Sequence, residues 1–223
     1  ETWCSWDNGQ KAYEMMSCYD GLLELYKITK NPDYLKAVEA TVRNIIDEEI
    51  NIAGSGSAFE CFYHGKRLQT DPAYHTMETC VTMTWMKLCQ NLLDLTKNPL
   101  YADQIEKTTY NALLAALKED AGQIAKYSPL EGVRSAGEHQ CGMHVNCCNS
   151  NGPRAFAMIP TAAVLSSNDS LFVNLYGPST TKASLGKNEI SLEQTTAYPE
   201  DGDIEIAVNA PRNIEFAVAV RIP

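Results

Sequence analysis

Apolar residues recur every three or four positions over much of the first 117 residues, which is the spacing of buried faces on α-helices. The pattern is clearest in the segment 77–95. There one face carries Met77, Val81, Thr84, Trp85, Leu88, Cys89, Leu92 and Leu95. The pattern predicts helices near 11–28, 32–50, 77–95 and 101–117, so we expect a mainly helical chain.

The helical region contains an internal repeat with an offset of 67 residues. The segment Thr29–Tyr34 (TKNPDY) recurs as Thr96–Tyr101 (TKNPLY). Each copy predicts a helix, an Asn-Pro turn and a second helix, because proline is favoured in the first turn of a helix. One helical hairpin cannot bury its own apolar face, so the repeat favours stacked hairpins in an α/α toroid or helical solenoid.

From about residue 171 the pattern changes to short strand-like runs separated by Gly, Pro, Asn and Asp. The runs cover 171–176, 189–192, 204–208 and 216–220. This spacing predicts antiparallel β-structure, the start of a β-sandwich. We therefore expect a helical portion at 1–168 and the start of a β-sandwich domain at 169–223.

The composition, with 44% hydrophobic and 21% charged residues in 223, is typical of a globular protein. A net charge of −10 argues against a surface for nucleic acid or anionic membranes. No apolar run approaches the roughly 20 residues of a membrane span. Neither end resembles a natural terminus, so we expect a fragment of a longer protein, and the sequence does not indicate its compartment.

The residues best suited to bind a metal or to react are two adjacent cysteines, Cys147 and Cys148, and the pair Glu78 and Cys80 that lies 67 residues before them. They offer three sulfurs and one carboxylate, the ligand count of a tetrahedral zinc site. Residues two apart in mid-helix point away from each other, so Glu78 and Cys80 are expected at a helix entrance. The turn-rich residues 149–153 predict a kinked loop for the cysteine pair. A vicinal disulfide and two unrelated buried thiols are the alternatives.

Several motifs occur in an order that resembles a known family. They are His75–Cys80 (HTMETC), Leu100–Glu106 (LYADQIE), Cys147-Cys148 with Asn151 and Arg154, and Val173–Tyr176 (VNLY). Together they resemble glycoside hydrolase family 127, the bacterial β-L-arabinofuranosidase-like enzymes, and their relatives in family 146. The likeness covers nearly the whole chain. It implies an (α/α)6 barrel followed by β-sandwich modules in a bacterial enzyme, whose compartment, cytoplasm or periplasm, stays unknown.

The resemblance also implies a zinc ion held by Glu78, Cys80, Cys147 and Cys148, with Cys147 as the nucleophile. Coordination to zinc deprotonates a thiol that would be mostly protonated at pH 7. The thiolate can attack an anomeric carbon and form a thioglycosyl intermediate, which water hydrolyses with net retention of configuration.

The family keeps its acid/base glutamate in a Gly-Glu-Ala-Phe-like segment about 16 residues before the Glu-Thr-Cys carboxylate. Here Glu60 is the best match, 18 residues before Glu78, with Phe59 in the place of the flanking glycine. We expect Glu60 to be the acid/base. The alternative is a solvated loop carboxylate.

The expected sugar-binding residues are Tyr127, His64, His75, His144 and Lys11. Tyr127 lies in a Tyr-Ser-Pro-Leu segment that resembles a substrate-contacting segment of the family. Each of the three histidines lies near a motif and could bind a sugar hydroxyl or serve a structural role.

Lys11 stands at a helix start where relatives tend to place a substrate-binding histidine. A shift of 67 places it on Glu78, so both helix starts are expected at the same end of the barrel. A cation there could favour a sugar that bears a carboxylate. The alternative is that Lys11 is an exposed lysine without a role in binding.

The leading hypothesis is a zinc-dependent retaining glycosidase that releases terminal L-arabinofuranose or a related pentose from plant cell-wall oligosaccharides or polysaccharides. One alternative keeps this machinery for an acidic or deoxy pectic sugar. Another is a non-catalytic helical module, stapled by zinc, that binds glycans or partners.

Overall fold

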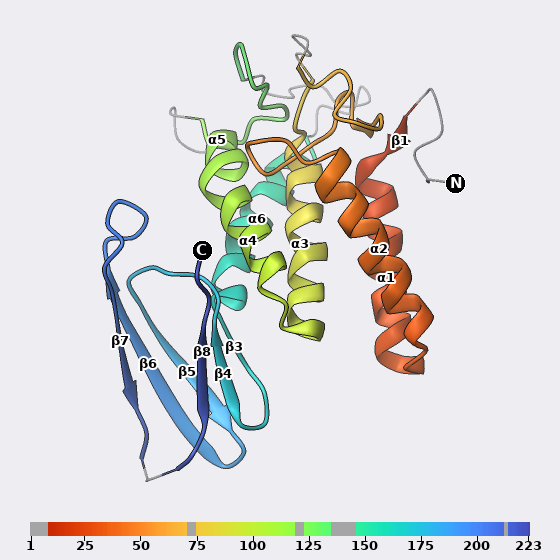
Figure 1. The fold of residues 1–223 in the computed structure, drawn as a ribbon. Helices are drawn as coiled ribbons and strands as arrows, with labels where there is room; N and C mark the ends of the chain where they lie inside the picture. The colour runs from red at the N-terminus through yellow and green to blue at the C-terminus, as the bar shows by residue number, and fades with distance from the viewer. Residues whose placement is uncertain (1–8, 71–74, 119–122, 135–145, 212–213) are drawn as a thin grey trace.

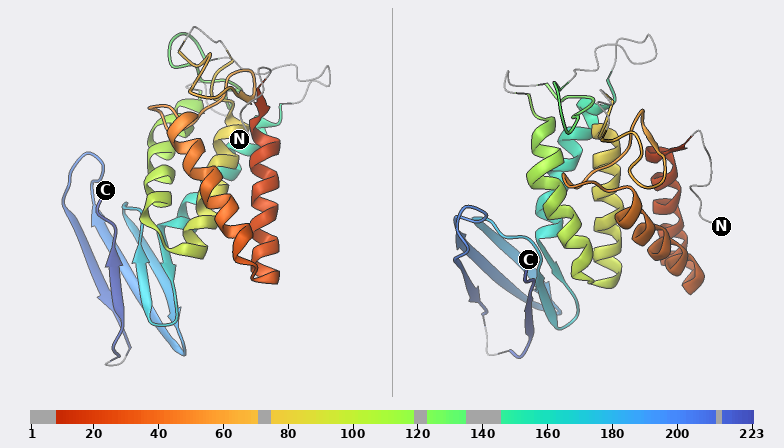
Figure 2. Two further views of the ribbon diagram at one scale, coloured as in Figure 1. Left: turned by 45° about the vertical axis from the view of Figure 1, so that its right-hand side comes forward. Right: turned by 45° about the horizontal axis from the view of Figure 1, so that its top comes forward.

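The computed structural model describes residues 9–70, 75–118, 123–134, 146–211 and 214–223. Figure 1 shows a group of upright helices and, beside their lower ends, two small sheets. The longer loops that the structure describes, 49–70 and 123–134, gather at the opposite, upper end, and the two further views in Figure 2 show the same division. Helical and sheet elements are therefore both present, as predicted.

The two copies of the repeat form two helical hairpins, as predicted. The first consists of α1 (Ala12–Thr29) and α2 (Pro32–Glu48), and the second of α3 (Thr79–Thr96) and α4 (Pro99–Thr108). The turns have the same construction. In each, a lysine with left-handed backbone ends the first helix, and an asparagine side chain (Asn31 or Asn98) accepts a hydrogen bond from the backbone two residues later.

Helix α4 continues into a π-helical turn, η1 (Thr109–Leu113), and a short helix, α5 (Leu114–Ala116). The loop before α3 crosses this point. The Thr108 hydroxyl donates to the Gly54 carbonyl at 2.6 Å, and the Ala112 backbone N–H donates to the Ala53 carbonyl at 3.1 Å. The Ala112 N–H thus bonds to a carbonyl outside the helix, within the wider π-helical turn η1.

Helix α3 is the centre of the helical core. It packs against α1, α4 and α6 (Cys148–Ala163), and it is buried almost all round. Trp85, Leu88 and Leu92 have no exposed surface. A helix that is apolar on every side is expected in a core rather than at a surface.

Helix α6 corrects the prediction of a kinked loop at 149–153. The residues Asn149, Ser150 and Gly152 have weak helix propensity, and Pro153 lacks a backbone N–H, yet the segment is helical. The buried residues of α6 are mostly small, which allows it to lie close against α3. Tertiary packing therefore overrides local propensity here.

The sheets each contain three strands. One has the order β3 (Val164–Ser166), β4 (Ser170–Val173) and β8 (Ala217–Val220), and the other has β5 (Ser179–Leu185), β6 (Asn188–Thr196) and β7 (Ile204–Asn209). All pairs are antiparallel except β4 with β8, which is parallel and corrects the expectation of a wholly antiparallel arrangement. Leu171 and Val173 share one core with Leu185, Ile190 and Leu192, so the two sheets pack together.

Two short strands at the loop end complete the fold. In β1 (Gln10–Lys11) and β2 (Cys61–Phe62), Lys11 pairs with Cys61 and so lies beside Glu60. No helix in the described part of the chain is long and apolar enough to cross a membrane.

Candidate metal and catalytic site

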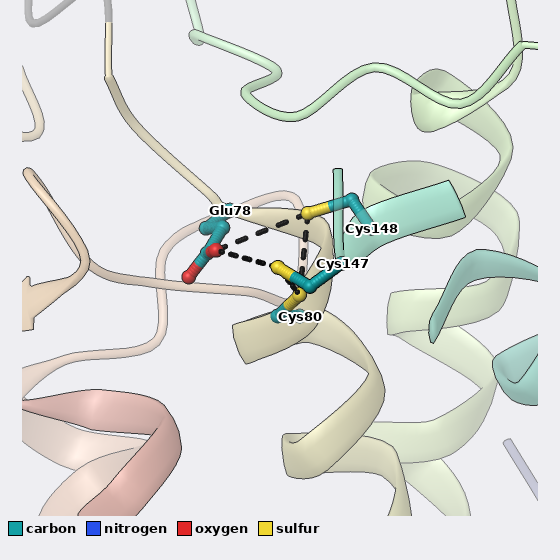
Figure 3. Close-up of side chains that lie close together, drawn as sticks. All are labelled: Glu78, Cys80, Cys147 and Cys148. Atoms are coloured by element: carbon teal, nitrogen blue, oxygen red, sulfur yellow. Dashed lines mark hydrogen bonds between the residues drawn. The ribbon is translucent and has the colours of Figure 1, made fainter. Parts of the chain in front are cut away.

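The four proposed metal ligands come from the starts of two neighbouring helices at the loop end. Glu78 is the residue before α3 and Cys80 lies in its first turn, while Cys147 is the residue before α6 and Cys148 begins it. Each pair therefore sits where the chain enters a helix, and the two side chains of a pair can face one point. Figure 3 shows the three sulfurs and the Glu78 carboxylate converging.

The ligand atoms of this group all lie within 4.8 Å of one another. Cys80 Sγ is 2.9 Å from Cys147 Sγ and 3.3 Å from Cys148 Sγ. Glu78 Oε1 is 3.8 Å from Cys147 Sγ and 3.9 Å from Cys148 Sγ. In a tetrahedral zinc site the ligand atoms would be roughly 3.6–3.8 Å apart. The donor set and its spacing therefore fit a zinc-sized cation, with the shortest sulfur pair opening by under about 1 Å.

Electrostatics at the cluster also favour a cation. Burial, and after it the nearby charge of Glu60, raises the pKa of the Glu78 carboxyl to about 7. The neighbouring Cys148 thiol, burial and Glu78 together raise the pKa of Cys80. Anionic forms of these groups are costly unless a positive charge lies between them.

Two further residues of α6 support the cluster. The Asn151 side-chain amide is buried and donates to Cys80 Sγ at 3.0 Å, and Arg154 Nη1 donates to Asn151 Oδ1 at 3.0 Å. Groups behind the ligands commonly orient them and tune their basicity. The motif order drew attention to both residues, but the sequence did not indicate these contacts.

Three hydrogen-bond donors surround the Glu60 carboxylate. Lys11 Nζ is 2.5 Å from its Oε2, Lys126 Nζ is 2.8 Å from its Oε1, and the Tyr127 hydroxyl donates to Oε1 at 2.7 Å. Burial alone raises the pKa of Glu60, but the hydrogen bonds from Lys11, Lys126 and Tyr127 outweigh it and lower the pKa to about 2. The carboxyl group is therefore ionised at neutral pH. Sequence reasoning missed Lys126, which carries no motif signal.

Backbone pairing explains why these residues meet. The segment 57–61 pairs with 75–77 through Ala58 and Thr76, and the segment 76–79 pairs with 126–128 through Glu78 and Tyr127. Three stretches far apart in the chain are thus held side by side. They carry the acid/base candidate, the carboxylate ligand and the tyrosine.

The remaining predicted site residues fall in different places. His75 is exposed and packs edge-on against Tyr127, with ring centroids 4.7 Å apart. His64 is exposed and its backbone N–H donates to Glu49 at 2.6 Å. Lys11 precedes α1 as Glu78 precedes α3, which confirms the equivalence that the repeat predicted. His144 lies outside the described residues.

A pocket of about 220 Å³ opens over the cluster. It is lined by Tyr13, Glu14, Glu60, Glu78, Cys80, Cys147 and Asn151. The most exposed of the four proposed ligands, Cys147, and the acid/base candidate Glu60 thus face one cavity. Tyr13 and Glu14, in the first turn of α1, were not expected there because neither belongs to a recognisable motif.

The model of the β-L-arabinofuranosidase GH127 catalytic domain matches residues 8–161, and that of the GH127 middle domain matches residues 170–223. This chain belongs to glycoside hydrolase family 127. All four proposed ligands and Glu60 lie within the part matched by the catalytic-domain model.

A curated relative of this GH127 chain is the non-reducing end β-L-arabinofuranosidase of Bifidobacterium longum subsp. longum. The two are 25% identical over 182 residues, which are 76% of this chain and 27% of that protein. This chain therefore spans about a quarter of the length of the curated relative.

Solved structures agree with this family. A GH127 β-arabinofuranosidase is 30% identical with a TM-score of 0.83, and the match covers 95% of this chain and 33% of that one. A GH127 β-L-arabinofuranosidase from Geobacillus stearothermophilus T6 is 25% identical with a TM-score of 0.83. That match covers 100% of this chain and 40% of the other.

Proposed function

We propose that this GH127 chain forms the catalytic site of a retaining glycosidase that releases terminal L-arabinofuranose or a related pentose from plant cell-wall glycans. The observation that carries the proposal is the shared pocket of Cys147 and Glu60. A nucleophile and an acid/base that face one cavity are the two groups that a retaining mechanism needs. The arabinofuranosidase relatives support the choice of sugar.

The proposed cofactor is Zn²⁺, held by Glu78, Cys80, Cys147 and Cys148. The three sulfurs and one oxygen suit this ion by donor type and spacing. When bound, zinc keeps the thiols deprotonated at neutral pH.

Cys147 is the proposed nucleophile because it is the most exposed of the four ligands and lines the pocket. Its Sγ forms a bond to the anomeric carbon while the bond from that carbon to the leaving oxygen breaks, and Glu60 gives a proton to this oxygen. Water then forms the new bond to the anomeric carbon, the carbon–sulfur bond breaks, and Glu60 takes a proton from the water.

Glu60 must change its protonation state during this cycle. Its ionised form is ready to accept a proton from water, whereas proton donation requires a higher pKa than about 2. The Lys11 side chain is 53% exposed and that of Lys126 only 11%. We propose that the arriving sugar displaces Lys11, which removes one of the two cations and raises the pKa of Glu60. Tyr127 and Lys126 then keep the carboxyl group in position.

The charge of the pocket favours a neutral sugar over an acidic one. Three carboxylates, those of Glu14, Glu60 and Glu78, line the pocket, and no lysine or arginine is among its described lining residues. A sugar carboxylate would meet like charges at close range. Contacts of the sugar with His64 and His144 stay predictions.

The finer architecture is also a proposal. We propose that the two hairpins and α6 are part of an (α/α)6 barrel at 1–168, and that residues 169–223 begin a β-sandwich domain. Support comes from the repeated hairpins and from the two family models, which cover 8–161 and 170–223.

The test is replacement of Cys147 by alanine, with Cys18→Ala as the control for loss of an exposed thiol that does not line the pocket. Cys147→Ala is expected to lower kcat on an arabinofuranoside by at least about 10³-fold, because no other described thiol that lines the pocket is as exposed. Cys18→Ala should keep full activity. Circular dichroism would check that both variants are folded.

A sugar-like electrophile provides a second measurement. Mass spectrometry should find the adduct on Cys147 in the wild-type protein. Full turnover by Cys147→Ala would refute the nucleophile assignment. A wild-type protein that binds zinc but forms no adduct and releases no sugar would support the non-catalytic alternative.

A further inference from the structure

A row of aromatic rings leads from Glu60 to the protein surface. Tyr127 is buried and its hydroxyl donates to Glu60. The ring of His75 packs against Tyr127 at 4.7 Å between centroids, and the ring of Phe59 packs against His75 at 5.3 Å. Phe59 is 50% exposed, and among the described phenylalanines it is the one that is exposed.

The backbone holds this row in place. The Phe59 N–H donates to the His75 carbonyl at 2.8 Å, and the flanking residues Ala58 and Thr76 form a β-bridge. Phe59 and Glu60 both have a left-handed backbone, with φ values of 50° and 68°. Non-glycine residues rarely adopt this conformation, and it is retained mainly where the surroundings impose it at functional sites. The exposed ring is therefore presented by a constrained segment.

The chemistry proposed for Glu60 places the leaving group on the same side. An acid/base residue must reach the glycosidic oxygen, so the sugar attached to that oxygen lies beside Glu60 and outside the pocket that holds the cleaved sugar. Phe59 directly precedes Glu60, and His75 lies next to Phe59. The aromatic row thus reaches the pocket through Glu60, which lines it and accepts a hydrogen bond from Tyr127.

We propose that Phe59 and His75 form a stacking platform for the first sugar ring of the leaving group, so that the substrates are oligosaccharides rather than simple alkyl glycosides. This inference rests on the proposed function. Sugar rings have an apolar C–H face, and exposed aromatic rings bind such faces at low entropic cost because few torsions must be fixed.

The experiment compares two substrates of the full-length protein, an L-arabinofuranosyl disaccharide and methyl L-arabinofuranoside, which lacks the second ring. Phe59→Ala is expected to lower the ratio of kcat/KM for the disaccharide to that for the methyl glycoside by about tenfold, the scale of one aromatic contact. Phe59→Trp keeps an aromatic face and should retain at least half of the ratio. Leu68→Ala removes an exposed apolar residue from the same loop and is the matched control.

Binding provides a measurement that does not need turnover. In a Cys147→Ala background, Phe59→Ala should weaken the Kd for the disaccharide by about tenfold in calorimetry. An unchanged Kd, or an equal loss of kcat/KM on both substrates, would overturn the platform. Failure of the wild-type protein to hydrolyse either substrate would instead contradict the proposed function, and the calorimetric comparison would still decide the platform.

Discussion

Glu49, at the end of α2, has no exposed surface, and its carboxylate supports the loop that carries Glu60. The His64 backbone N–H donates to Glu49 Oε1 at 2.6 Å. Burial raises the pKa of Glu49 to about 7, against the opposing effect of backbone hydrogen bonds from His64 and Tyr63. The protonation of one buried carboxyl group, that of Glu49, is thus coupled to the hydrogen bonding of this loop.

The sign of this link follows from the raised pKa. Between the ordinary value of 4.5 and about 7 the folded protein binds more protons at Glu49 than the unfolded chain, so its stability falls as pH rises through this window. Glu49→Gln should remove this fall and raise the free energy of unfolding at pH 8 by about 2 kcal/mol relative to the wild type. Urea denaturation at pH 5 and pH 8 would measure it.

The exposed Glu24→Gln is the control for removing one carboxylate, and it should leave the pH profile unchanged. A Glu49→Gln variant that loses as much stability as the wild type between pH 5 and pH 8 would contradict the prediction.

Among the elements, α6 depends on close approach. Gly152 lies where a Cβ atom would stand 2.9 Å from the Ile124 side chain, and Ile124 begins the segment that carries Lys126 and Tyr127. Gly21, in the exposed face of α1, has nothing within 4 Å of the same position. Replacing each glycine by alanine therefore compares the cost of tighter packing in α6 with the gain in helix propensity in α1.

Gly21→Ala should stabilise the protein by about 1 kcal/mol, because alanine is the better helix former. Gly152→Ala should destabilise it by about 1 kcal/mol, because overpacking against Ile124 exceeds the same gain in propensity. Thermal denaturation would show shifts of opposite sign. Stabilisation by both substitutions would mean that Ile124 moves aside freely.

Across the whole molecule, Arg221 joins the sheets to the helices. Its side chain is 2% exposed, and Nη1 lies 2.8 Å from Asp103 while Nη2 pairs with Glu106, both on α4. Glu106 also accepts from the Tyr198 hydroxyl at 2.9 Å. A buried charge that follows β8 and has both of its charged partners on α4 fixes the way the sheets meet this helix.

Arg221→Met should lower the free energy of unfolding by about 3 kcal/mol, because two carboxylates lose a buried partner. Lys182→Met, which breaks an exposed pair with Glu189 at 3.4 Å, should have no measurable effect. Urea denaturation of both variants would test this. Equal stability of both variants would contradict a joining role for Arg221.

The sequence alone determined what depends on short-range chemistry. The 67-residue repeat predicted both hairpins because apolar spacing and the capping residues Asn31 and Asn98 act within a few residues of the chain. The motif order also grouped Glu78 with the cysteine pair, and this grouping is seen in the structure. These features could be predicted because each needs only its own neighbours or a complete motif.

The tertiary structure alone decided the rest. Helix α6 forms from turn-rich residues because packing against α3 outweighs their weak helix propensity, and the parallel pairing of β4 with β8 joins segments that local pattern cannot orient. Lys126 meets Glu60 only because three distant backbone segments pair side by side. Contacts between residues far apart in the chain depend on the packing of whole elements, and no local pattern carries that information.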